Sequence, residues 1–151
     1  MEFPRKRIAV GALIRDEQGR LLLVKPAYRD GWLIPGGVVD ADESPRDGLL
    51  RELREELGLT RPIDTLLCVD YMVAGAAYGE GLHLLFDGGC LNSIQAQALV
   101  ICDAELVALH WATAAEAQAL LVPSLARRLQ SLEEAPLGTL LYLENGLPLT
   151  P

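Results

Sequence analysis

Apolar and polar residues alternate in short runs at the start of the chain. Residues 8–14 are rich in aliphatic side chains, residues 16–19 have the polar and glycine composition of a turn, and residues 21–25 are apolar again. Two short apolar runs separated by a turn are typical of a β-hairpin. We therefore expect these two segments to pair as antiparallel strands.

The hydrophobic period changes between residues 45 and 57. Leucines recur there on one stripe of an α-helix, namely Leu49, Leu50, Leu53 and Leu57. Ser44 is a good N-cap, Pro45 suits the first helical position, and Gly58 provides a stop signal. The pattern predicts an amphipathic helix that begins at Pro45 and ends before Gly58.

The rest of the chain mixes strand and helix signals. Strand-like runs cover residues 66–74, 82–87 and 106–111, and the glycine-rich residues 75–81 suit a hairpin connection. Thr113 and Glu116 form a capping box for a short helix, and a second helix follows from residue 124. Residues 88–97 fit either a loop or an irregular edge. No long linker divides the chain, so we expect residues 1–151 to form a single domain.

The composition restricts the class of protein. Half of the 151 residues are hydrophobic, which suffices for a core, and the net charge is −8 at pH 7. General nucleic-acid binding is not expected, because phosphates require a basic surface. No apolar stretch approaches the roughly 20 residues of a membrane span, and the N-terminal apolar run is too short for a signal peptide. We expect no membrane partner and a cytoplasmic location, with Cys68, Cys90 and Cys102 as small buried residues.

Three glutamates of the predicted helix indicate where the chemistry lies. Glu52, Glu55 and Glu56 fall on one face, where ionised carboxylates repel one another unless a cation lies between them. Oxygen ligands suit a hard cation such as Mg²⁺ or Mn²⁺, which carboxylates share with substrate phosphates. Gly48, one turn earlier on that face, leaves room for a substrate group. A solvated helix face is the alternative that periodicity alone leaves open.

The spacing of the polar residues in this region resembles the Nudix box. The matching residues are Gly37, then Glu43, then Arg51-Glu52-Leu53, then Glu55-Glu56 and Gly58-Leu59. Every defined position of the motif is matched between Gly37 and Leu59. The resemblance implies an α/β fold of the Nudix type, an α/β/α sandwich with a central mixed β-sheet. It also implies hydrolysis of a phosphoanhydride bond in a nucleoside diphosphate linked to another moiety.

The resemblance assigns roles to individual residues of the box. Glu52, Glu55 and Glu56 match the metal-binding glutamates of the family, with Mg²⁺ as the expected ion and Mn²⁺ as an alternative. Arg51 and Glu43 match the pair that braces the helix and its loop. On the helix, we expect Arg51 to lie away from the arc of the three glutamates.

The proton acceptor for the attacking water is expected among Glu55, Glu56 and Glu105. Glu105 belongs to this set because it precedes a strand ending in Trp111, a position where Nudix proteins often place a glutamate near the metals. Asp103 and Glu105 can equally be interpreted as the polar end of a loop.

Substrate contacts are expected in the loops beside the box. Tyr28 and Arg29 lie just before it, Gly37 opens it, and Tyr78 lies in the glycine-rich connection. Exposed loop positions are the plainer interpretation of Tyr28, Arg29 and Tyr78. His83 is expected to be a structural strand residue rather than a catalyst.

The substrate is not specified by a motif. Family markers for reduced dinucleotides, coenzyme A and ADP-ribose are missing downstream of Leu59, which leaves nucleoside triphosphates, modified nucleotides and nucleotide sugars. Two alternatives remain, namely a nucleotide-binding sensory module without turnover, and a hydrolase or isomerase of a non-nucleoside diphosphate. The expected partner is a small nucleoside diphosphate derivative, and a homodimer is left open.

Overall fold

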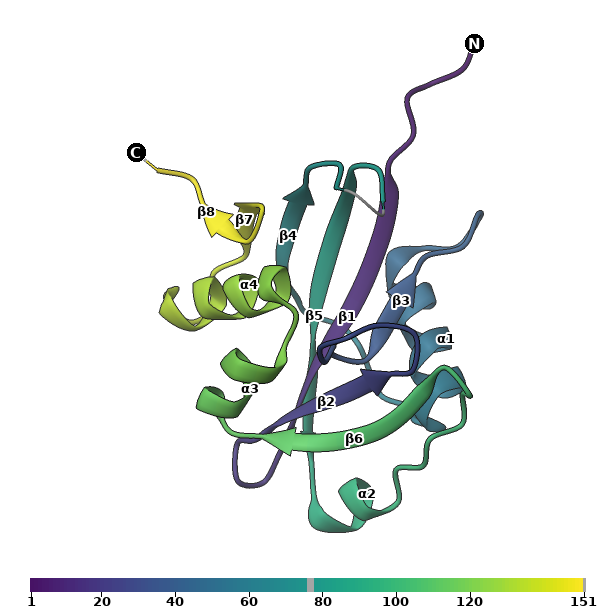
Figure 1. The fold of residues 1–151 in the computed structure, drawn as a ribbon, viewed down its shortest axis with the longest axis vertical. Coiled ribbons are helices and arrows are strands. Elements are labelled where there is room, and N and C mark those ends of the chain that lie inside the picture. Colours follow the sequence, from purple (N-terminus) through teal and green to yellow (C-terminus); the bar gives the residue numbers. More distant parts are fainter. Residues whose placement is uncertain (76–77, 151) are drawn as a thin grey trace.

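A computed structural model describes residues 1–75 and 78–150 (Figure 1). The strands are β1 (Arg7–Asp16), β2 (Leu21–Pro26), β3 (Gly36–Val38), β4 (Leu66–Met72), β5 (Gly81–Leu91), β6 (Leu106–Ala112), β7 (Leu141–Glu144) and β8 (Leu147–Pro148). The helices are α1 (Pro45–Leu57), α2 (Ser93–Gln97), α3 (Ala114–Leu120) and α4 (Pro123–Glu134). The strands predicted near residues 8–14, 21–25, 66–74, 82–87 and 106–111 are present, as are the three predicted helices, whereas β3, α2, β7 and β8 were not predicted.

The strands form one mixed sheet of eight strands. Their order is β6-β2-β1-β5-β4-β7-β8, and β3 lies beside β1 off this path. β1 pairs with β5 and β4 with β7 in parallel, whereas the other strand pairs are antiparallel. The long strand β1 therefore lies inside the sheet, with β2 and β6 on one side and β5, β4, β7 and β8 on the other.

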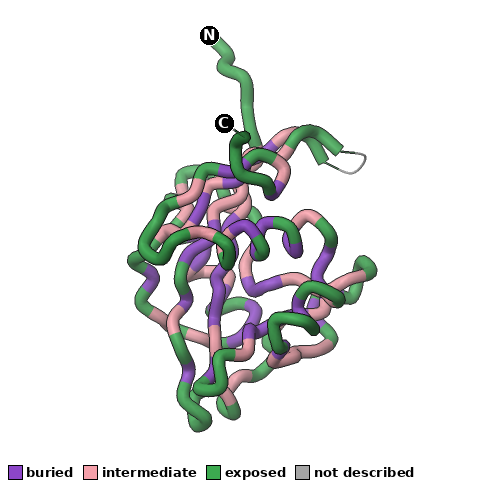
Figure 2. Tube along the Cα trace, turned by 90° about the vertical axis from the view of Figure 1, so that its left-hand side faces the viewer, coloured by how far each residue is buried: buried purple, intermediate pink, exposed green. Residues whose placement is uncertain are grey.

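Helices cover both faces of this sheet. Along the first two strands, Leu13 and Leu23 pack in a core with α3 and α4, whereas Ile14 and Leu22 pack in a second core with α1. Strands that are buried on both faces alternate in this way because successive side chains point to opposite sides. Figure 2 shows the buried segments running through the middle of the molecule. The α/β/α sandwich with a central mixed sheet is confirmed.

The predicted N-terminal hairpin is only partly correct. The two strands are joined by a turn, but β1 and β2 are in register only at Arg15 and Leu21. β3 occupies the same edge of β1 from Ala9 to Gly11, so β2 diverges and pairs along its length with β6. The hairpin connection predicted between β4 and β5 is confirmed, since Met72 pairs with Gly81, although residues 76–77 lie outside the described part of the chain.

Two further expectations need correction or completion. Residues 88–91 continue β5 and residues 93–97 form α2, where the sequence left a loop or an edge open. Cys68 is buried as expected, but Cys90, near the end of β5, and Cys102, in the loop before β6, are exposed. Within the described residues, no helix is long and apolar enough to cross a membrane.

Candidate active site

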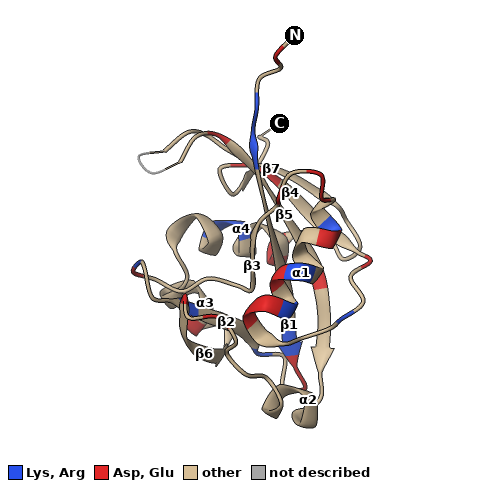
Figure 3. Cartoon of the chain, turned by 90° about the vertical axis from the view of Figure 1, so that its right-hand side faces the viewer, with Lys and Arg blue, Asp and Glu red and all other residues tan. Residues whose placement is uncertain are grey.

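Helix α1 has the boundaries that its end signals predict. The Ser44 hydroxyl accepts a hydrogen bond from the Asp47 amide at 3.0 Å, and Pro45 occupies the first turn. At the other end Gly58 adopts the left-handed conformation, with φ of 62°, and its amide donates to the Arg54 carbonyl. The apolar stripe anchors the helix to the sheet, so the charged side of α1 faces outward (Figure 3).

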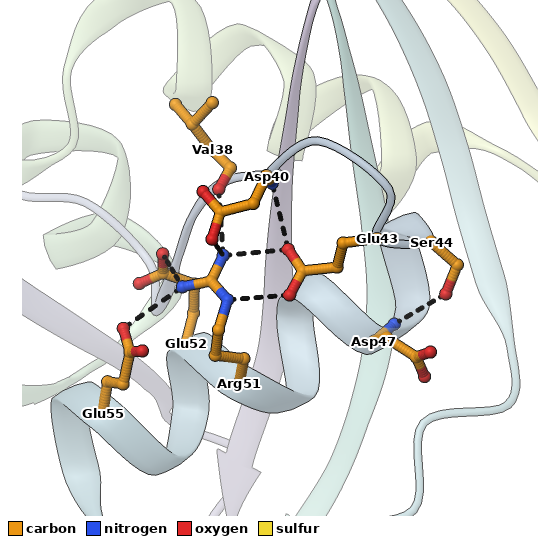
Figure 4. Close-up of polar contacts among 8 residues, drawn as sticks. All are labelled: Val38, Asp40, Glu43, Ser44, Asp47, Arg51, Glu52 and Glu55. Carbon is orange, nitrogen blue, oxygen red and sulfur yellow. Dashed lines mark hydrogen bonds and ion pairs between the residues drawn. The ribbon is translucent and has the colours of Figure 1, made fainter.

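Arg51 is the centre of the polar contacts on this side (Figure 4). Its guanidinium donates to both carboxylate oxygens of Glu43, at 2.8 and 3.0 Å, and to the Val38 carbonyl at 3.2 Å. These hydrogen bonds, first from Arg51 and then from the Asp40 amide, lower the pKa of Glu43 to about 2. Arg51 and Glu43 thus connect the helix to the loop that precedes it.

The expectation that Arg51 lies away from the glutamates is wrong. Its Nη1 donates to Glu52 at 2.9 Å and to Glu55 at 3.2 Å. The physical reason is helix geometry, because residues four apart are neighbours on the surface and Glu55 follows Arg51 at that spacing. Glu55 remains largely exposed, whereas Glu52 is mostly covered.

Glu56 is the buried carboxyl of the site. It is 8% exposed, and one carboxylate oxygen lies 3.4 Å from the amide nitrogen of Gly36, which donates to it. Burial, and then the charge of Glu52, raises the pKa of Glu56 to about 8. Burial also raises the pKa of Glu52, although Arg51 opposes this. A carboxyl whose pKa lies near neutrality can accept or release a proton at working pH.

Two glycines lie directly against neighbouring carboxylates. A Cβ atom on Gly37 would lie 2.5 Å from Cδ of Glu52, so a larger residue there would displace the Glu52 carboxylate from its present position. A Cβ atom on Gly48 would lie 2.9 Å from a carboxylate oxygen of Glu43. The space beside Gly48 is therefore filled by Glu43 and not left for a substrate, which corrects the expectation from the sequence.

Asp103 is an acidic residue of the site that the sequence interpretation did not select. The amide of the preceding residue, Cys102, donates to the Glu56 carbonyl at 2.8 Å, which fixes this loop against the end of α1. The charge of Asp103 adds to the burial that raises the pKa of Glu52 and of Glu56. The sequence feature that could have identified Asp103 is the pair of acidic residues, Asp103 and Glu105, before β6.

Glu105 follows Asp103 by two residues in the stretch before β6. Its side chain is exposed, and its amide donates to the Asp103 carboxylate at 2.9 Å. Its charge acts on Tyr28, whose pKa is raised first by burial and then by Glu105. The catalytic role of Glu105 stays a prediction, and Asp103 joins it as a candidate.

The donor set suits a hard divalent cation. Among the described residues, no three His, Cys, Asp or Glu side chains already converge as a metal site, and Arg51 holds Glu52 and Glu55 by hydrogen bonds. The pKa values of Glu52 and Glu56 are nevertheless raised, first by burial and further by the charges of neighbouring carboxylates. Carboxylate oxygens in this state match the ligand preference of Mg²⁺ and Mn²⁺.

A cleft of about 750 Å³ begins at the box loop and extends over the face of the sheet that α4 covers. The four residues predicted to contact substrate all line it, namely Tyr28, Arg29, Gly37 and Tyr78. Tyr28 and Tyr78 are more than half exposed there. The cleft and the carboxylate site share the backbone of residues 36–38, so one ligand can reach both.

The raised pKa of Glu56 predicts how stability depends on pH without metal. The pKa is about 8 in the folded chain against 4.5 for an unperturbed glutamate, so the folded state holds a proton that the unfolded state releases. This stabilisation is complete below pH 4.5 and is lost as the pH rises to 8. In EDTA, urea unfolding from pH 5 to 8 should show a steeper loss of stability for the wild type than for Glu56→Gln. Parallel profiles would contradict the assignment.

A glycine loop and a capped helix gather carboxylates beside a cleft on the sheet of an α/β/α sandwich. Residues 5–132 match the NUDIX domain, and the chain belongs to this family. A CTP pyrophosphohydrolase of Escherichia coli (strain K12) is 37% identical over 106 residues, which cover 66% of this chain and 78% of that protein.

Other relatives are matched over shorter stretches. A MutT-like protein of Streptomyces ambofaciens is 38% identical over 63 residues, which cover 42% of this chain. An RNA pyrophosphohydrolase of Halorhodospira halophila is 46% identical over 50 residues, which cover 33% of this chain. The matches span 41% and 28% of the lengths of these two relatives.

Solved structures show the same fold. The Escherichia coli ORF135 protein superimposes with a TM-score of 0.68 and 27% identity over 89% of this chain and 96% of its own. The MutT protein of Methanosarcina mazei Go1 gives a TM-score of 0.74 with 23% identity over 87% of this chain and 96% of its own. The sandwich fold is therefore common to this chain and these proteins.

Proposed function

We propose that the protein is a metal-dependent pyrophosphohydrolase that cleaves a phosphoanhydride bond in a nucleotide derivative. The observation that carries this proposal is that Glu52 and Glu56 rest against the box loop, which lines a cleft of about 750 Å³, while the charge of Asp103 acts on both glutamates. The pyrophosphohydrolase names of the relatives support it. A hydrolase rather than a sensory module is favoured because every glutamate of the box is present.

Glu52, Glu55 and Glu56 would hold Mg²⁺ or Mn²⁺, with Asp103 beside them. A bound divalent ion would neutralise the diphosphate and lower the pKa of a water molecule. Glu56, which is buried against the box loop, is one candidate to accept the proton of the attacking water. Glu55 and Glu105 are exposed and remain the other candidates for this role.

The remaining residues of the site would hold the box glutamates in position and bind the substrate. Arg51 and Glu43 would fix the helix against the loop, so that the glutamates keep their positions. The amides of the box loop and the side chain of Arg29 would approach the diphosphate, and Tyr28 and Tyr78 would contact the attached group. Nucleoside triphosphates are the favoured substrates, because a relative of which the match covers 78% is named a CTP pyrophosphohydrolase. Modified nucleotides and nucleotide sugars are the next candidate substrates.

A panel of nucleoside diphosphate derivatives with Mg²⁺ or Mn²⁺ tests this function. We expect turnover of at least one nucleoside triphosphate, measured as phosphate or pyrophosphate released, and loss of turnover in EDTA. Isoprenoid diphosphates serve as the comparison for a non-nucleoside substrate. Tight binding of a nucleotide with no turnover under any metal would instead favour the sensory module.

A further inference from the structure

The inner end of the cleft lies on one row of the sheet. Asp70 of β4 is in register with His83 of β5, which is in register with Ala9 of β1, which in turn pairs with Val38 of β3. Residues paired in this way point to the same face. Arg128 of α4 extends to this row and donates a hydrogen bond to the Asp70 carboxylate. The small side chain of Ala9 leaves space in the cleft between the box loop and His83.

Three polar atoms at this end are buried without a hydrogen-bond partner among the described residues. They are Nε of Arg7, Nε2 of His83 and Nη2 of Arg128, and all three residues line the same cleft. Arg128 is only 3% exposed. A buried donor or acceptor without a partner costs about 1–3 kcal/mol. Their common location indicates that the missing partner is a group that enters the cleft.

The charges around these atoms define which group fits. Arg128 forms a buried ion pair with Asp70 at 2.5 Å, so its charge is already compensated. Burial, and then the charges of Arg128 and Arg7, lower the pKa of His83 to about 4, so the imidazole is neutral near pH 7. The Arg7 guanidinium stacks over the Tyr78 ring, 4.7 Å from its centre. Two arginine donors thus flank a neutral imidazole.

We propose that Arg7, His83 and Arg128 form a recognition site for the carbonyl-bearing edge of a nucleobase. The proposal rests on the proposed function, because it places the base of the substrate beyond the diphosphate. Arginine donors require acceptors, and a ring carbonyl oxygen supplies one without bringing a charge next to the buried Asp70 carboxylate. Uracil, with two carbonyl groups beside a ring N–H, matches the site best. Adenine, which has an amino group and no carbonyl, matches it least.

The same donors could also donate hydrogen bonds to the oxygen atoms of a phosphate. Only Arg7 would attract a phosphate electrostatically, because the charge of Arg128 is compensated by Asp70 and His83 is neutral. The Asp70 carboxylate would repel the phosphate. The carbonyl group is therefore the favoured source of the oxygen atoms. Inorganic pyrophosphate is the probe that separates the two sources.

Binding without turnover tests this site. Dissociation constants of UMP and AMP are measured by calorimetry at pH 7.5 in EDTA for the whole chain. We expect UMP to bind at least about tenfold more tightly than AMP. His83→Phe keeps an aromatic ring but removes the nitrogen atoms, and Arg7→Met removes the donor without leaving a buried charge. Each should reduce the preference for UMP about fivefold.

Two further variants make the test specific. His83→Gln returns a polar atom near the position of Nε2 and should restore part of the preference. Tyr142→Phe removes an exposed aromatic hydroxyl outside the cleft and should behave as the wild type. Equal binding of UMP and AMP by the wild type, or an unchanged ratio in both His83→Phe and Arg7→Met, would overturn the proposal. Loss of pyrophosphate binding in parallel with UMP binding would show a phosphate site instead and would overturn it too.

The result is independent of whether the chain hydrolyses nucleotides. A preference for UMP that these variants abolish, combined with no turnover in the substrate panel, would support the base site and reject the hydrolase. Turnover that does not discriminate between UTP and ATP, in the wild type and in His83→Phe alike, would support the hydrolase and reject the base site.

Discussion

Replacing Glu56 by glutamine is expected to lower metal-dependent hydrolysis by about two to four orders of magnitude while the chain stays folded. The buried carboxyl can hold a proton near neutral pH because its pKa is about 8, and glutamine keeps the shape but can neither accept the proton nor bind a cation as an anion. The measurement is kcat at saturating Mg²⁺ on the best substrate of the panel, together with a urea unfolding curve.

A matched exposed glutamate provides the control for this prediction. Glu133 is exposed on α4, and Glu133→Gln should retain wild-type turnover. Glu55→Gln should also reduce turnover strongly if Glu55 binds metal, even though Arg51 contacts it in the structure. Wild-type kcat in both Glu55→Gln and Glu56→Gln would remove the metal chemistry from this helix.

The helix was predictable because its signals are local. Ser44, Pro45 and Gly58 each act on backbone groups within one turn, and the leucine stripe needs only the helix period. The capping box at Thr113 and Glu116 was predictable for the same reason.

Features that depend on distant segments were not predictable in this way. The divergence of β2 from β1 arises because β3, later in the chain, takes the same edge. Asp103 reaches α1 through a loop whose amide bonds the Glu56 carbonyl, and no local pattern specifies that contact. His83 looked like an ordinary strand residue, because the arginines around it come from β1 and α4. The spacing of residues along the sequence does not show which side chains from distant strands and helices meet.

Replacing Arg128 by methionine is expected to destabilise the fold by about 3–5 kcal/mol, which is typical when one partner of a buried ion pair is removed. The Arg128 and Asp70 side chains are 3% and 0% exposed, so Asp70 would keep a buried charge without its partner. The Gly146 amide, which donates to Asp70 at 2.9 Å, cannot compensate for that charge. Urea unfolding at pH 7 measures the loss.

The double variant Asp70→Asn/Arg128→Met distinguishes the effect of losing the ion pair from the cost of burying an unpaired Asp70 charge. Asparagine is neutral and can still accept from the Gly146 amide, so the double variant should be more stable than Arg128→Met alone. Asp64→Asn removes an exposed partner of Arg46 and should leave the unfolding curve close to that of the wild type. An Arg128→Met chain as stable as Asp64→Asn would show that α4 does not need this pair. The inner end of the cleft would then have to be held by packing alone.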